Sequence, residues 1–341
     1  HALMGKFANA LKPFWLKTMP RAGKNSLREL ITGAHMGLNI RRLGKADMRE
    51  FMRIATLPAR DLMDEFFEDE LLKATLSWDC LVGSKLAPRS PNHAVLALLY
   101  RMSGISHGAR VDQLIDALQA AATAAGATIR TSTVVEKVLV RAAGDGIEAH
   151  GVQLAGGELV EATRVISSTD PKRTFFDLVG VRNLEIGFSN RIRRLRCDGY
   201  VAKLHLALSG LPEFTGLDSP RGRMIIAPEM DAIEFAFDDA KYGSCSEHPV
   251  MEFVVPTIDN PSLAPAGQHV LSAHVMYVPY GLKGGWNDQE SDAMRERAIE
   301  VLSRYAPGLR TQIRHRELLP PPDLESVYGV TGGHWHHTEF A

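Results

Sequence analysis

Residues 144–149 (GDGIEA) match the glycine spacing G-x-G-x-x-G/A. In dinucleotide-binding folds this turn joins a strand to a helix, and the helix N-terminus faces the phosphates. Upstream, Val134–Val140 is β-branched and apolar, which predicts a strand. Downstream, residues 147–154 and the pair Gly156-Gly157 predict short strands joined by a turn, with no apolar repeat at helical spacing. We therefore predict a β-hairpin with its tip at Gly144-Asp145-Gly146 and no phosphate-binding loop there.

The composition is that of an ordinary globular protein. The 341 residues are 45% hydrophobic and 23% charged, with a formal net charge of −1. This near-neutral balance gives no electrostatic footprint for nucleic acid. The cysteines Cys80, Cys197 and Cys245 are far apart, so we expect neither a disulfide framework nor a zinc ribbon. A reducing compartment fits this usage.

Apolar runs in the sequence are short. The longest, Ala94–Tyr100, is far below the ~20 residues that span a bilayer. No signal peptide is visible, although the sequence opens on His1. We expect a cytoplasmic protein, with the mitochondrial matrix as the alternative, and leave peripheral contact with a membrane open.

Residues 1–105 read as helices. Met48, Phe51, Met52 and Ala55 recur at helical spacing, and similar apolar stripes follow as far as Tyr100. Two interpretations of this Met- and Phe-rich region stay open. It is either a helical core, the usual role of such stripes, or the lining of an apolar substrate cavity.

The rest of the chain alternates between helices and strands. A helix predicted from Val111 ends at Gly126, and strands are predicted at 127–130, 134–140 and 164–168. Longer strands follow, with one helix capped at Asn287 or Asp288. These strands are Tyr200–Leu208, Arg223–Pro228, Ala232–Phe237, Val250–Pro256 and Val270–Val278. The pattern predicts the α/β (α+β) class, with a mixed, mostly antiparallel sheet.

Three stretches of the sequence carry a family resemblance. They are LIDALQAAATAAGATIRTSTVVEKVLV from Leu114, GVQLAGGELVEATRVISSTDP from Gly151, and FFDLVG from Phe175. In order and spacing they resemble the middle of the phytoene desaturase-like FAD-dependent oxidoreductases, within the flavin amine oxidase superfamily. The closest subgroup is the phytoene dehydrogenase-related proteins, which the terminal GGHWHHTEF also suits.

The resemblance implies a domain organisation. Residues 1–105 would form the helical part of a substrate domain, and 106–182 a partial FAD-binding, Rossmann-like domain with a β-hairpin insertion. Residues 183–325 would form the sheet of the substrate domain, and 326–341 a segment returning towards the flavin. The family's glycine pair before the helix appears here as Ile105-Ser106. The sequence resembles an internal segment of such an enzyme, without the family's two flavin-binding ends.

The resemblance also implies cofactor contacts in the region 131–168. Family members pair the backbone of a strand valine with the FAD adenine, in a pattern T-x-x-V-x-x-I that Val135 fits. The simpler interpretation is a core valine. Ser167 and Ser168, at the end of the strand predicted at 164–168, would also lie at the cofactor.

Lys203 is the candidate catalytic residue. The stretch GYVAKLHL from Gly199 resembles the amine oxidase strand whose lysine holds a water against flavin N5. A lysine there stabilises negative charge on the reduced ring. A charged residue between apolar neighbours in a strand also needs a partner. The alternative is an outward-facing lysine on a half-exposed strand. Alternation places Val201 and His205 on the Lys203 face.

The histidines near the C-terminus suggest two roles. On an extended strand His334 and His336 would share a face and His337 would lie opposite, so only two could converge on a metal. We therefore predict no metal site. The resemblance places His334, Trp335 and His336 in the wall of the substrate pocket.

Two functional hypotheses follow. The first is an FAD-dependent oxidoreductase of the dehydrogenase or desaturase type, which takes a hydride from a hydrophobic small molecule onto the flavin. The absence of an obvious acid–base or nucleophile motif fits this hypothesis. The alternative is a cofactor-free binding or structural module, or an inactive fragment of such an enzyme.

Overall fold

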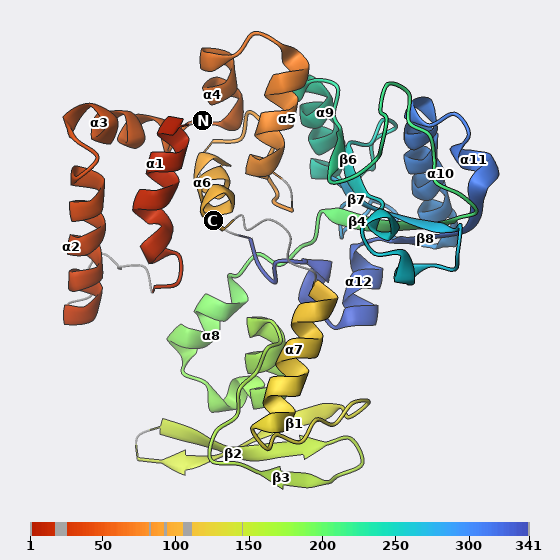
Figure 1. The fold of residues 1–341 in the computed structure, drawn as a ribbon. Helices are drawn as coiled ribbons and strands as arrows, with labels where there is room; N and C mark the ends of the chain where they lie inside the picture. The colour runs from red at the N-terminus through yellow and green to blue at the C-terminus, as the bar shows by residue number, and fades with distance from the viewer. Residues whose placement is uncertain are drawn as a thin grey trace. The chain divides into compact units, whose positions relative to one another are not determined.

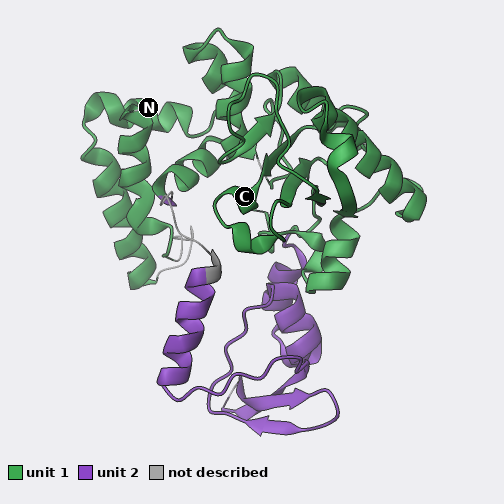
Figure 2. Ribbon diagram, turned by 45° about the vertical axis from the view of Figure 1, so that its right-hand side comes forward, with its two compact units in different colours: residues 1–103, 196–341 green, residues 104–195 purple. Residues whose placement is uncertain are grey.

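The computed structural model describes residues 2–17, 26–81, 83–91, 94–104, 111–144 and 146–339. The chain forms two compact units, which Figure 2 distinguishes by colour. Unit 1 comprises His1–Ser103 and Arg196–Ala341, and unit 2 comprises Gly104–Leu195. Ile105-Ser106 and Asp145, named above, lie outside the described residues.

The first hundred residues of unit 1 are helical, as predicted (Figure 1). Their core is formed by fully buried side chains that include Phe7, Ile54, Trp78 and Leu81. The helices are α1 (Ala2–Leu11), η1 (Lys12–Phe14), α2 (Leu27–Arg41), α3 (Lys45–Ile54), α4 (Ala59–Phe66), α5 (Glu70–Leu81) and α6 (Ala94–Gly104). No helix within the described residues is long and apolar enough to cross a membrane.

The second part of unit 1 is built on a five-stranded sheet in the order β5-β6-β7-β4-β8. The strands are β4 (Val201–Leu208), β5 (Met224–Ile226), β6 (Met251–Val254), β7 (His269–Met276) and β8 (Ile313–Leu319). Every pair of neighbours is antiparallel. The predicted mostly antiparallel sheet is therefore confirmed, and β8 is a strand that the sequence pattern did not reveal.

The two faces of this sheet differ in chemistry because side chains alternate along each strand. On β4, Leu204 and Leu206 are fully buried in a cluster with Met294 and Leu302 of α10 (Asp288–Tyr305). Val201 instead joins the core of the helical region. Asn287 caps α10 by accepting a hydrogen bond from the Glu290 N–H, as the sequence predicts.

One predicted strand is wrong. Ala232–Phe237 lies inside a helix, α9 (Met230–Lys241). The short apolar run 232–237 fits the spacing of a strand as well as that of a helix. The buried residues Met230, Ile233, Ala236 and Ala240, however, recur every three or four positions, which is the helical spacing. Packing of this buried stripe against the helical core therefore favours a helix over the predicted strand.

The remaining elements of unit 1 are short. They are η4 (Pro256–Ile258), η5 (Pro261–Leu263), α11 (Leu309–Gln312), α12 (Pro321–Tyr328) and η6 (Thr331–Gly333). The proline run 320–322 starts α12, because proline is compatible with the first turn of a helix.

Unit 2 contains a three-stranded sheet in the order β1-β2-β3 and four helical segments. The strands are β1 (Val135–Ala143), β2 (Gly146–Leu154) and β3 (Leu159–Glu161), and the helical segments are α7 (Val111–Ala124), the π-helix η2 (Arg173–Gly180), η3 (Val181–Asn183) and α8 (Ile186–Arg193). Ala143 pairs with Gly146 across an antiparallel ladder. No helix begins at Gly146, so the predicted hairpin is confirmed.

The strands predicted at 127–130 and 164–168 are absent from unit 2. Ile166 is 96% exposed, and no strand lies beside it among the described residues of the unit. A strand needs a hydrogen-bonded neighbour, and a parallel one needs neighbours that cover it. Without them these apolar segments stay irregular. Apart from this, alternating helices and antiparallel sheets confirm the expected α/β (α+β) class.

Candidate functional site

A row of three polar side chains crosses the sheet of unit 1. Glu252 on β6 is paired in register with His274 on β7, and His274 is paired with Lys203 on β4. Figure 1 labels these three strands. Directly opposed residues on neighbouring strands project to the same face. This face is opposite the one that packs against α10, because Leu204, the residue after Lys203, lies in the α10 cluster.

The three side chains form a continuous hydrogen-bonded chain. Lys203 Nζ lies 2.8 Å from His274 Nε2. His274 Nδ1 lies 3.1 Å from Glu252 Oε1. The second carboxylate oxygen of Glu252 accepts a hydrogen bond of 2.8 Å from the indole N–H of the fully buried Trp78. Lys203 is therefore not an outward-facing surface lysine.

Charged groups surround Glu252, which lies at one end of the row. The Arg223 guanidinium lies 3.4 Å from Glu252 Oε2 and 2.6 Å from Asp79 Oδ1. Arg101 also contacts Asp79, at 3.2 Å. Glu252 is only 8% exposed, and a buried carboxylate is stable only when it is paired and hydrogen-bonded in this way.

The environment shifts the pKa of each member of the row. Burial lowers the pKa of Lys203 to about 8, although the Glu252 carboxylate opposes that shift. Burial also lowers the pKa of His274 against the opposing effect of Glu252. Burial alone would raise the pKa of Glu252, but the hydrogen bonds from His274 and Trp78 and the nearby Arg223 hold it below its usual range. Burial thus disfavours positive charge on both Lys203 and His274, and the Glu252 carboxylate opposes that effect at each.

Trp335 packs against the centre of the row. Its ring lies edge-on to the His274 ring, with the centroids 4.2 Å apart. Gly83 approaches the indole so closely that a Cβ built there would lie 2.2 Å from Trp335 Nε1. That Nε1 atom is buried and has no hydrogen-bond partner in the described structure. The indole nitrogen is therefore covered by Gly83 and not open to a ligand.

Two glycines fix the path of the segment that carries Trp335. Gly332 and Gly333 have positive φ values of 67° and 64°. A Cβ on Gly332 would lie 2.1 Å from the Cys197 carbonyl oxygen, so no other residue fits without displacement of the backbone. Gly332 also accepts a hydrogen bond from the Gly199 N–H, just before β4. The segment after β8 is thus anchored to the entrance of β4.

The extended geometry expected for the three histidines is wrong. The His337 N–H donates to the His334 carbonyl at 2.7 Å, and His337 has φ 66°. The His336 N–H donates to His334 Nδ1 at 3.2 Å. The residues form a turn because the glycine pair and this local bond replace strand pairing. His334 is buried, which lowers its pKa to about 4, whereas His336 is exposed.

The described residues hold no group of three or more His, Cys, Asp or Glu side chains arranged as metal ligands. The His334 and His336 rings are 6.2 Å apart between centroids. Cys80, Cys197 and Cys245 form no disulfide with one another. Burial raises the pKa of Cys80 and Cys245 to about 12, so these two thiols are unreactive at neutral pH.

The cofactor residues expected in unit 2 lie on its strand and on an irregular segment. Val135 is the first residue of β1, is half-buried and pairs with Leu154. The hydroxyl of Ser167 lies 2.7 Å from that of Thr174 and 3.1 Å from that of Thr169. Ser168 is exposed. Val135, Ser167 and Ser168 remain predictions for this unit.

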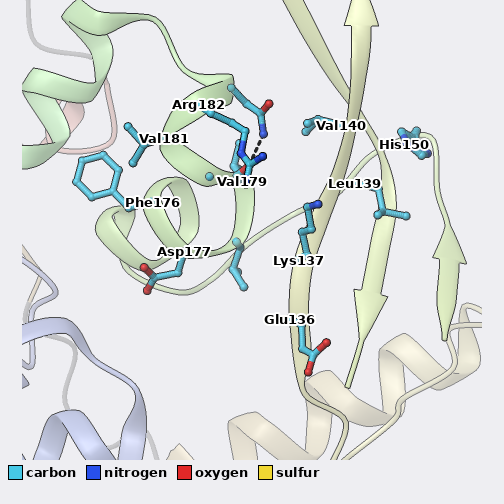
Figure 3. A pocket seen from close by; sticks show the side chains of 13 residues that line it. Glu136, Lys137, Leu139, Val140, His150, Phe176, Asp177, Val179, Val181 and Arg182 are labelled. Carbon is cyan, nitrogen blue, oxygen red and sulfur yellow. Dashed lines mark hydrogen bonds between the residues drawn. The ribbon is translucent and has the colours of Figure 1, made fainter. Parts of the chain in front are cut away.

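A hollow of about 740 Å³ lies in unit 2 between β1 and the π-helix η2 (Figure 3). Its wall begins at Glu136, the residue after Val135. The side chains around it carry both charges: Lys137 and Arg182 on one hand, and Glu136 and Asp177 on the other. This mixed lining favours no single ligand class.

Sequence reasoning identified Lys203 but missed its two partners. The signal was present, because Glu252 and His274 each stand between apolar residues in a strand, as Lys203 does. A polar side chain in that setting needs a partner. What the sequence lacked was the register, which alone shows that the three meet.

Comparison with known proteins finds relatives that are named as oxidoreductases and desaturases. No protein-family model matches the sequence. Pyridine nucleotide-disulfide oxidoreductase domain-containing protein 2 of Rattus norvegicus is 33% identical over 313 residues, which is 86% of this chain and 53% of that protein. An all-trans-zeta-carotene desaturase of Myxococcus xanthus is 28% identical, over 80% of this chain and 50% of the desaturase. The chain is a relative of the phytoene desaturase-like oxidoreductases.

The family resemblance read from the sequence is therefore confirmed. The chain spans about half the length of the curated relatives that it matches. A solved oxidoreductase from Methanosarcina mazei supports the fold, with a TM-score of 0.50 at 18% identity over 83% of this chain and 63% of that one.

Proposed function

We propose that the chain is the substrate-domain and central part of an FAD-dependent oxidoreductase of the dehydrogenase or desaturase type. The observation that carries the proposal is the half-buried Lys203 amine, held by His274 and Glu252 on a sheet face beside Trp335. The names of the relatives of this chain, an oxidoreductase domain-containing protein and a desaturase, also support the proposal.

The chemistry of this face fits one side of a flavin ring. A bound flavin supplies a ring that takes up a hydride from the substrate and gains negative charge. The Lys203 ammonium would stabilise the negative charge of a ring placed beside it. Its Nζ could also hold a proton or a water. Val201, on the same strand face as Lys203, is apolar and keeps water away.

The other parts of FAD are assigned less completely. The hairpin at Gly144 and Gly146 lacks the helix that a diphosphate site requires, so we assign the diphosphate to no described residue. In unit 2 we propose that the backbone of Val135 contacts the adenine and that Ser167 and Ser168 contribute hydroxyl groups. Both assignments rest on the family resemblance.

The substrate that we propose is a hydrophobic small molecule. The names of the desaturase relatives specify carotenoid hydrocarbons, which offer no polar group to bind. In this chain, Trp335 and the half-buried surface around Lys203 are consistent with an apolar ligand, and His334 and His336 flank Trp335 in sequence. A purely apolar substrate needs shape and dryness more than hydrogen bonds.

Flavin colour provides the first test. The chain and the complete reading frame that encodes it should be purified, supplemented with FAD, and examined for flavin absorption and for quenching of flavin fluorescence. We expect bound flavin in the complete protein and weak or no binding by residues 1–341 alone, because the hairpin supplies no diphosphate loop. A complete protein that stays colourless with added FAD would favour the cofactor-free binding or structural module.

A further inference from the structure

The hydrogen bonds of the polar row allow only certain proton positions. The Trp78 indole nitrogen can only donate, so Glu252 Oε2 must accept. Arg223 also faces that oxygen, at 3.4 Å, which favours the ionised carboxylate. An ionised carboxylate only accepts, so His274 Nδ1 must carry the hydrogen in its 3.1 Å contact with Oε1. Glu252 therefore fixes the tautomer of His274.

With Nδ1 protonated and one further proton held by the contact, His274 Nε2 faces Lys203 Nζ at 2.8 Å in one of two states. In the first, the lysine ammonium donates to a neutral imidazole. In the second, the imidazolium donates to a neutral amine. Every hydrogen bond in the row exists in both states, so the proton passes without any side chain moving.

We infer that Lys203 and His274 share one proton across this contact, and that Glu252 is a positioning residue that holds the pair in register. The transfer breaks one N–H bond on Lys203 and forms one on His274 Nε2, with no other reactant. The row can therefore present either an ammonium or a neutral amine at the sheet face. This inference goes beyond the proposed function and does not require a flavin.

The surroundings of the row determine where the proton rests. Burial lowers the pKa of both Lys203 and His274, so near neutral pH the pair holds one proton rather than two. Four other titratable or charged groups interact with members of the pair: Glu252 from β6, Arg101 from α6, His205 on β4 and His336 after β8. Further out, Glu317 on β8 acts on His205, and Arg223 beside β5 lies between Glu252 and Asp79 of α5. The Arg223–Asp79 contact neutralises one charge of each sign.

Two probes of the full 341-residue chain test the inference. The first is the ¹⁵N signals of the histidine rings, with His274 assigned through His274→Gln. The second is the pH dependence of acylation of Lys203 by acetic anhydride, measured by peptide mass spectrometry with the exposed Lys137 as an internal reference. We expect His274 in the Nδ1–H tautomer and one common midpoint near pH 8 in both probes, against about 10.4 for an ordinary lysine.

Two variants separate sharing from simple contact. Lys203→Met should remove the midpoint near pH 8 from the His274 signals and leave the Nδ1–H tautomer, because Glu252 still accepts. Glu252→Gln should remove the tautomer preference and move the Lys203 midpoint downward, because the carboxylate raises the pKa of Lys203. Acylation of Lys137 should not change in either variant.

The inference is overturned by either of two results on the unaltered chain. One is His274 in the Nε2–H tautomer. The other is a His274 signal that stays constant while Lys203 titrates. Neither measurement uses FAD, so a failure here is distinguishable from a failure of the proposed oxidoreductase function.

Discussion

The Trp335 indole lies edge-on to the His274 imidazole, with ring centroids 4.2 Å apart. An edge-to-face contact of this kind stabilises by about 0.5–1.5 kcal/mol beyond the burial of area. It also joins the segment after β8 to the middle of the polar row. Gly83, after α5, packs against the indole at its nitrogen and so restricts its position.

Gly83→Ala tests this packing. Gly83 has φ 78°, and an added Cβ would lie 2.2 Å from Trp335 Nε1. We expect the free energy of unfolding to fall by about 2–5 kcal/mol. Backbone strain accounts for about 1–2 kcal/mol of this and overpacking for about 1–3 kcal/mol. The matched control is Gly44→Ala, where φ is 89° and nothing lies within 4 Å of the Cβ. Urea unfolding measures both, and equal losses would contradict the Trp335 contact.

Trp78→Phe tests the support of Glu252. The variant removes a hydrogen bond of 2.8 Å from a buried carboxylate. Hydrogen bonds to charged groups contribute about 1.5–3 kcal/mol, and the smaller ring adds a cavity. Trp286→Phe is the control, because the Trp286 indole N–H donates a hydrogen bond of 2.9 Å to a neutral acceptor, the Pro279 carbonyl. In urea unfolding at pH 7, we expect Trp78→Phe to lower the free energy of unfolding by at least about 1 kcal/mol more than Trp286→Phe does. This is about the difference between hydrogen bonds to charged and to neutral acceptors. Similar losses would argue against an ionised Glu252.

His334 predicts a pH dependence of stability. Burial lowers its pKa to about 4, whereas an unfolded histidine has a pKa of about 6.5. Between these values the unfolded chain binds a proton that the folded chain does not, so stability falls as the pH drops from 6.5 to 4. The slope is at most about 1.4 kcal/mol per pH unit for one proton.

The measurement is urea unfolding at pH 7 and at pH 5. His334→Gln should weaken the dependence on pH, and His35→Gln, on an exposed position of α2, should not. An unchanged slope in His334→Gln would show that His334 titrates alike in both states.

Local patterns predicted those parts of the fold that local residues determine. The alternation on β4 places Leu204 in the α10 core and Lys203 on the opposite face. The glycines at 144 and 146 predict the hairpin, because a turn requires their conformational freedom. Met- and Phe-rich stripes predict the helical region, and in the structure Phe51 and Ala55 lie in its core whereas Met52 is 63% exposed.

Features that depend on distant neighbours were not predictable. The run 232–237 fits a strand or a helix, and only packing on the helical core decides between them. The segment around Ile166 has strand composition but no neighbouring strand among the described residues. The partners of Lys203 come from strands about 50 and 70 residues later, so their meeting depends on the register of the sheet.

Lys203→Met tests the role of the row in flavin chemistry. In the complete reading frame we expect unchanged FAD content and a reductive half-reaction or reoxidation slowed by ~10²-fold or more, the usual effect of removing one positioned polar group. The methionine keeps the length of the side chain but removes its charge. Replacement of Asp145, at the tip expected for the hairpin, is the control and should change neither FAD content nor rate. Stopped-flow absorbance of the flavin measures both steps, and an unaltered rate in Lys203→Met would leave the row with no part in the flavin reaction.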